Sequence, residues 1–80
     1  MEGEEMRAHR SLDCKGMLCP MPLVKLSKAM KGLQAGEILG VIADVECFDL
    51  DVKAWCDVTG NPLVALEHVG EATTAYIRKA

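Results

Sequence analysis

The chain has 80 residues, of which 50% are apolar and 26% are charged, with a formal net charge of −3. A chain this short forms a single domain, because it buries only about 60% of its unfolded surface, and its composition excludes the low hydrophobicity that is typical of disorder. The acidic balance argues against direct nucleic-acid binding, which requires clustered Lys and Arg side chains.

The first nine residues are polar and show no periodicity, which predicts a flexible N-terminal tail at 1–9 and a domain at 10–80. This stretch lacks the apolar centre of a signal peptide. No apolar run in the chain approaches the roughly 18 residues of a membrane span. We therefore expect a cytoplasmic protein without a membrane span, whose four cysteines remain reduced.

The first half of the domain predicts a strand, a helix and a second strand. Residues 10–13 suit a short strand, and a Cys-Lys-Gly break follows it. From Pro20 onward, apolar residues recur at steps of three and four, which predicts an amphipathic helix with Pro20 as its first residue and an end near Gly36. The β-branched run 37–43 predicts a strand that closes a right-handed, parallel βαβ unit.

The second half predicts a helix and a hairpin. Phe48, Val52 and Trp55 have helical spacing, and the Gly-Asn-Pro sequence at 60–62 ends that segment. The apolar runs 63–69 and 72–79 are joined by Gly-Glu, which fits a type II′ hairpin. The order βαβαββ predicts an α/β two-layer sandwich, with a four-stranded mixed sheet and two helices packed on one face.

Cys19 is the residue that points most directly to chemistry. It precedes Pro20 and Pro22, so we expect Cys19 to be the N-cap of the first helix, beside backbone N–H groups without an intrahelical partner. Such donors stabilise a thiolate, the nucleophilic form of cysteine. The alternative is that Cys19 is a small buried apolar residue, which is the commonest role of an unpaired cysteine.

The segment from Leu12 to Pro22, LDCKGMLCPMP, resembles the LDxRGxxCPxP signature of the TusA/SirA-like sulfur carriers. The resemblance extends to about Lys79. It implies that Cys19 accepts sulfane sulfur as a persulfide, without another cofactor, and passes it to the next protein of a sulfur relay. The donor would be a cysteine desulfurase or a rhodanese-type sulfurtransferase, and the carrier would not turn over without partner enzymes.

The same resemblance implies which residues support the site: Asp13, Lys15, Gly16, Pro20 and Pro22. Two departures bear on the choice of partner. Lys15 stands where the family usually has Arg, and Lys keeps the charge but lacks the planar guanidinium. Val45-Glu46 stands where the family often has Asp-Pro. The final acceptor, in tRNA thiolation, cofactor synthesis or sulfur oxidation, stays open.

Two other functions are compatible with these residues. In a thiol-redox or regulatory module, Cys14 and Cys19 would form a reversible disulfide, although their spacing is not the CxxC of thioredoxin-like sites. In an interaction domain, the open sheet face would bind protein or RNA. The scarcity of aromatic residues for stacking counts against RNA.

The remaining candidates have simpler interpretations. Cys47 and Cys56 flank the second helix and are expected to be packed or partly exposed thiols, without the paired spacing of a zinc site. His9 and His68 are expected to be solvated. Three lysines of the first helix form either a solvated face or a contact for an acidic partner: Lys25, Lys28 and Lys31.

Overall fold

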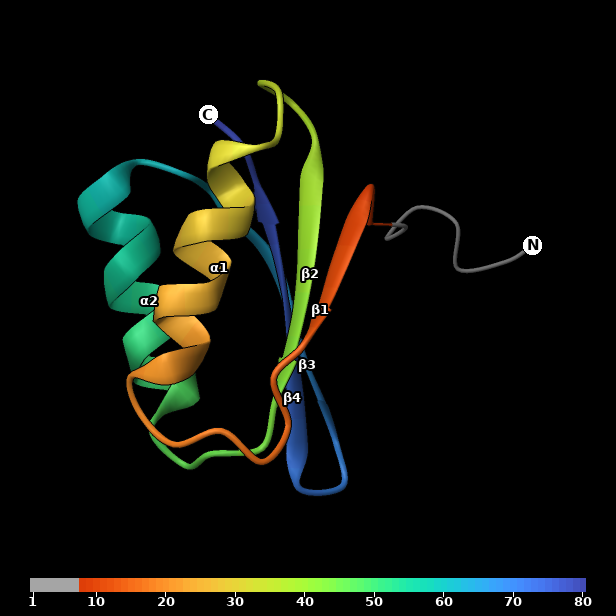
Figure 1. Cartoon of the computed structure of the whole chain (residues 1–80), viewed down its shortest axis with the longest axis vertical. Helices are drawn as coiled ribbons and strands as arrows, with labels where there is room; N and C mark the ends of the chain where they lie inside the picture. Colours follow the sequence, from red (N-terminus) through yellow and green to blue (C-terminus); the bar gives the residue numbers. More distant parts are fainter. Residues whose placement is uncertain (1–7) are drawn as a thin grey trace.

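Four strands and two helices follow the predicted order βαβαββ (Figure 1). The computed structural model describes residues 8–80, so most of the predicted tail lies outside the described residues. The elements are β1 (Arg10–Asp13), α1 (Met21–Lys31), β2 (Ile38–Ala43), α2 (Phe48–Thr59), β3 (Leu63–Val69) and β4 (Ala72–Arg78). In the described part of the chain, no helix is long and apolar enough to cross a membrane.

The strands form one mixed sheet in the order β1-β2-β4-β3. β1 and β2 are parallel, as the helical crossover between them predicts, while β4 pairs antiparallel with both β2 and β3. Val69 and Ala72 face each other across the two-residue turn, in which only Gly70 has a positive φ, of 61°. This is the pattern of the predicted type II′ hairpin.

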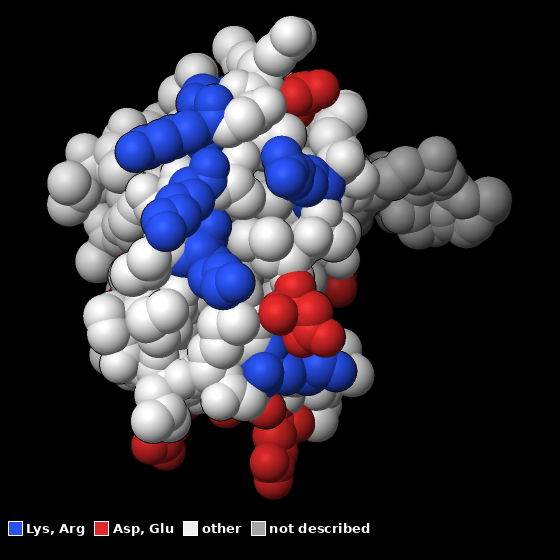
Figure 2. All heavy atoms as spheres, in the orientation of Figure 1, with Lys and Arg blue, Asp and Glu red and all other residues white. Residues whose placement is uncertain are grey.

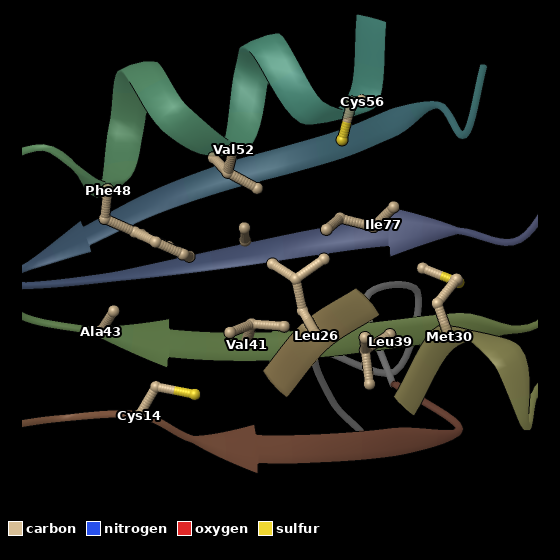
Figure 3. Packing of buried hydrophobic residues seen from close by; sticks show 11 residues of the cluster. Cys14, Leu26, Met30, Leu39, Val41, Ala43, Phe48, Val52, Cys56 and Ile77 are labelled. Atoms are coloured by element: carbon tan, nitrogen blue, oxygen red, sulfur yellow. The ribbon is translucent and has the colours of Figure 1, made fainter. Parts of the chain in front are cut away.

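Both helices lie on the same face of the sheet, which confirms the predicted two-layer sandwich (Figure 1). The core between the layers is shown in Figure 3. Leu39, Val41 and Ala43 alternate along β2 and are fully buried, because successive side chains of a strand point to opposite faces. Leu26 of α1 and Phe48 of α2 cover them from the other layer.

The helix ends differ from the prediction at α1 and agree at α2. α1 stops at Lys31 instead of near Gly36, because Gly32 takes the C-cap position. The Gly32 N–H donates to the Ala29 carbonyl, and the Leu33 N–H donates to the Met30 carbonyl. Glycine is a poor helix former. α2 ends where predicted, at Gly60, whose φ of 79° is a left-handed conformation that suits glycine.

The loops that follow β1 and β2 lie at one end of the sheet (Figure 1). They do so because the carboxyl ends of two adjacent parallel strands meet at the same edge. The Cys14 N–H donates to the Ile42 carbonyl at 2.7 Å, which continues the pairing just past β1. This places the segment 14–20, with Cys19, beside the segment 44–47.

Candidate functional site

Cys19 lies just outside the helix that it was predicted to cap. α1 begins at Met21, and its N-cap is Pro20, with Pro22 buried in the first turn. Cys19 is exposed, so the interpretation as a buried apolar residue is wrong. Pro20 is likewise not the first helical residue, and both prolines instead fix the backbone around the thiol.

The backbone donors expected to stabilise a thiolate at Cys19 are used elsewhere. Met21 N–H donates to the Leu18 carbonyl at 2.8 Å, and Leu23 and Val24 N–H groups both donate to Pro20. Pro22 has no N–H. The prolines that mark the motif therefore remove or redirect the donors, and the helix contributes only its dipole.

Cys19 is joined to Cys47, the residue directly before α2. The two form a disulfide across a sequence separation of 28, with Cα atoms 6.8 Å apart. This pairing corrects the prediction of reduced cysteines and the interpretation of Cys47 as a simple packed thiol. Asp51, one turn further along α2, brings its Oδ2 to 3.4 Å from Cys19 Sγ.

The same three residues are the only group in the described part of the chain that could offer three ligand atoms to a metal ion. The donor atoms of Cys19, Cys47 and Asp51 lie within 4.8 Å of one another. Metal binding requires thiolates, whereas the disulfide ties the two sulfurs to each other. In the reduced protein, the Cys19 thiol is placed to donate to the Asp51 carboxylate instead.

Two carboxylates hold the loop that leads to Cys19. Lys15 N–H donates to Asp13 Oδ1, at the end of β1, at 3.1 Å. Gly16 N–H donates to Asp44 Oδ1, in the loop after β2, at 2.9 Å. Gly16 has a φ of 83°, a conformation that other residues adopt at a cost. Lys15 itself is exposed.

Asp44 was not predicted to support the site. Its position directly after a parallel strand is the sequence signal that would have identified it.

Replacing Asp44 with Ala is expected to loosen this loop and lower the melting temperature. The Gly16 N–H loses its hydrogen-bond partner, which lowers the free energy of unfolding by about 1 kcal/mol. For a domain of this size, that corresponds to a melting temperature lower by roughly 4–8 °C. Calorimetry measures the shift, and amide exchange at Gly16 should accelerate. Glu46→Ala removes an exposed acid from the same loop and should leave both unchanged; equal effects from the two variants would contradict this role of Asp44.

Cys14 is separated from Cys19 by burial. Its side chain is 1% exposed and lies in the core with Val41 and Ala43 (Figure 3). The predicted Cys14/Cys19 redox pair is therefore corrected: Cys19 pairs with Cys47, and Cys14 is an unpaired buried cysteine. Cys56 is also buried, with its sulfur directed from α2 toward the sheet (Figure 3).

Burial should protect Cys14 and Cys56 from alkylation. Burial raises the pKa of Cys14, and it raises the pKa of Cys56 to about 11, whereas only thiolates are strong nucleophiles. After reduction at neutral pH, iodoacetamide should label Cys19 first, and mass spectrometry of peptides measures the order. All four thiols should react in urea. Rapid labelling of Cys14 or Cys56 in the folded protein would contradict the packing described.

The raised pKa of Cys56 also predicts a loss of stability in alkali. The unfolded thiol titrates near 9.0 while the folded one holds its proton to about 11, so the free energy of unfolding falls as the pH rises through this interval. Urea titrations at several pH values measure the slope. Cys56→Ala should flatten it, and an unchanged slope in that variant would show that another group is responsible.

His68 is exposed, as predicted, but it also has a hydrogen-bond partner. Its Nε2 lies 2.6 Å from Asp49 Oδ2 in the first turn of α2, and this hydrogen bond lowers the pKa of Asp49. Nineteen residues separate the pair, so local sequence carries no signal for it. His9 is exposed but not free, since Ile38 N–H donates to its Nδ1 at 3.0 Å.

Exposed apolar side chains lie close to Cys19 in the sequence, and exposed basic side chains follow farther along α1. Leu18, Met21 and Leu50 are 76%, 45% and 75% exposed, and they are neighbours in sequence of Cys19 or Asp51. Basic side chains gather over α1 in Figure 2, where Lys25, Lys28 and Lys31 are all exposed. An exposed thiol with apolar neighbours and a basic helix is suited to contact with another protein.

Comparison with known proteins places the whole domain in one family. The family described as Sulfurtransferase TusA matches residues 10–79. A Bacillus subtilis protein named "Putative sulfur carrier protein YrkF" is 42% identical over 74 residues, which are 92% of this chain and 40% of that protein. An Aquifex aeolicus protein with the same description is 36% identical and is matched over 39% of its length. The chain thus spans about two fifths of these two relatives.

A third relative, YrkI of Bacillus subtilis, carries the same description and is matched over 99% of its length at 36% identity. The fold is shared with the crystal structure of a SirA-like protein from Desulfitobacterium hafniense. That match has a TM-score of 0.76 at 23% identity and covers 86% of this chain and 95% of the other. The family match over 10–79 and the identity with YrkI show that this chain belongs to the TusA family of sulfur carriers.

Proposed function

We propose that Cys19 accepts a sulfane sulfur from a donor protein and holds it as a persulfide until an acceptor protein takes it. The observation that carries this proposal is the exposure of the Cys19 thiol at the N-terminal end of α1, while Cys14 and Cys56 are buried. A large donor enzyme can reach Cys19 and neither of the buried thiols.

The transfer balances without an external oxidant. The Cys19 thiolate attacks the terminal sulfur of a donor persulfide, a new S–S bond forms at Cys19, and the donor cysteine leaves as a thiolate. The same exchange then occurs at the acceptor protein. An acceptor thiolate attacks the outer sulfur of the Cys19 persulfide, and Cys19 leaves as a thiolate. No cofactor other than the transient persulfide is needed, and the disulfide to Cys47 must be reduced before loading.

The partners follow from this chemistry. The donor is a cysteine desulfurase or a rhodanese-type enzyme, because both carry persulfides on cysteine. Leu18 and Met21 provide exposed apolar contacts next to the thiol, and the lysines of α1 favour an acidic partner surface. The carrier is not expected to turn over alone.

Intact mass spectrometry tests the proposal. The reduced protein is incubated with a desulfurase and cysteine, or with a rhodanese and thiosulfate. Each transferred sulfur should add about 32 Da, reversibly by dithiothreitol. Cys19→Ser should gain nothing, whereas Cys14→Ala should load normally, because Ala keeps that buried position apolar. Loading of Cys19→Ser, or no adduct on any protein, would refute the proposal.

A further inference from the structure

We infer that Cys47 is a second reacting thiol, which discharges the Cys19 persulfide as hydrogen sulfide and leaves the Cys19–Cys47 disulfide. The inference rests on the proposed persulfide at Cys19 and adds a reaction to it. Its basis is the disulfide between the two loops, which directly shows that Cys47 Sγ reaches the inner sulfur of Cys19.

The backbone already permits this bond. The Cα atoms of Cys19 and Cys47 are 6.8 Å apart, within the range that disulfides span without movement of the chain. The loops that carry them are fixed to each other by the Gly16 hydrogen bond to Asp44 and the Cys14 hydrogen bond to Ile42. A thiol held this close attacks far faster than one arriving from solution.

The surroundings of the two thiols give them different tasks. Cys19 is exposed, whereas Cys47 is half-buried, so a bulky donor protein reaches Cys19 first. Cys47 is the N-cap of α2 and its side chain makes no capping hydrogen bond, which leaves its sulfur available. The positive end of the α2 dipole favours a thiolate at this position.

The reaction balances within the protein. Cys47 Sγ attacks Cys19 Sγ, the bond between Cys19 and the sulfane sulfur breaks, and that sulfur leaves as HS⁻. The sulfane sulfur is reduced by two electrons, and the two cysteines are oxidised to the disulfide. The Cys47 proton ends on the departing sulfide, and the Asp51 carboxylate, within 4.8 Å of both cysteine sulfurs, is placed to pass it. A dithiol reductant then restores both thiols.

The consequence is a competition between relay and discharge. An acceptor that docks promptly takes the sulfur from Cys19, while a carrier left loaded releases sulfide and becomes unable to load again until it is reduced. The Cys19–Cys47 disulfide is thus the spent form of the carrier.

The test compares loaded carriers after the donor has been removed. Wild type and Cys47→Ser are loaded from rhodanese and thiosulfate, separated from it by gel filtration without oxygen, and followed by intact mass and sulfide assay. Wild type should release about one sulfide per persulfide and end about 2 Da below the reduced mass, with Cys19 and Cys47 in one linked peptide. Cys47→Ser should keep the added 32 Da and release sulfide at least about 10-fold more slowly.

Two control variants, Cys47→Ala and Cys56→Ala, make the outcome decisive. Ser is a better N-cap than Cys, so Cys47→Ser should fold, and Cys47→Ala must retain the persulfide as well. Cys56→Ala should discharge like wild type. The inference about Cys47 is wrong if Cys47→Ser loads but discharges at the wild-type rate, or if the product is a dimer linked through Cys19. Either result leaves the proposed carrier function of Cys19 intact. If neither protein gains about 32 Da, the proposed function itself fails.

Discussion

Replacing Cys19 with Ser is expected to abolish sulfur relay through this chain. A serine oxygen cannot hold a sulfane sulfur in place of the thiolate, so transfer of ³⁵S from a loaded donor to an acceptor protein should fall to the level seen without the carrier. The residue is exposed, and α1 begins only at Met21. The variant should therefore fold normally, with the circular dichroism and melting temperature of the wild-type protein whose Cys19–Cys47 disulfide has been reduced.

Cys14→Ala is the matched control for this loss. Cys14 lies five residues earlier but is buried, and its removal should cost some stability while leaving relay intact. Full relay by Cys19→Ser would assign the sulfur to another thiol. Loss of relay in Cys14→Ala, with its fold intact, would restore the two-cysteine interpretation of the site.

Replacing Phe48 with Ala is expected to destabilise the domain severely. Phe48 is 1% exposed and belongs to the core between α2 and the sheet (Figure 3). Truncation of a buried Phe to Ala lowers the free energy of unfolding by about 3–5 kcal/mol, because the side chain's transfer free energy is lost and a cavity is left behind. Small domains have total stabilities of roughly 5–15 kcal/mol, so this variant should lie near the edge of folding.

Urea unfolding monitored by fluorescence of Trp55, the one tryptophan of the chain, measures this effect. Val58→Ala provides the control on the same helix, because Val58 is 86% exposed and its truncation should change the free energy of unfolding by less than about 0.5 kcal/mol. Similar losses in the two variants would show that α2 is not packed as described.

The order of elements and the layer arrangement could be predicted from the sequence because the signals are local. Glycines end both helices and open the final hairpin, and the βαβ handedness rule fixes how β1 and β2 pair. The start of α1 could not be placed correctly, since Cys19, Pro20 and Pro22 fit more than one capping arrangement. The structure uses Pro20 as the N-cap.

The contacts that complete the site depend on how the loops meet, which local patterns do not encode. Cys47 and Asp51 reach Cys19 only because the parallel pairing of β1 and β2 brings both following loops to one edge. A cysteine in each of the two loops that follow adjacent parallel strands, close to the start of the next helix, is the feature that would have indicated this pairing. The contact of His68 with Asp49 likewise depends on how α2 lies over β3.

The most direct test of the carrier role is to locate the sulfur on the loaded wild-type protein. Reduced protein is loaded from a cysteine desulfurase, its persulfides are capped at once with iodoacetamide, and the peptides are sequenced by tandem mass spectrometry. If this chain is a single-cysteine carrier, the extra sulfur lies on Cys19 and on no other residue. Sulfur on Cys14, Cys47 or Cys56, with Cys19 carrying only the alkyl group, would contradict it.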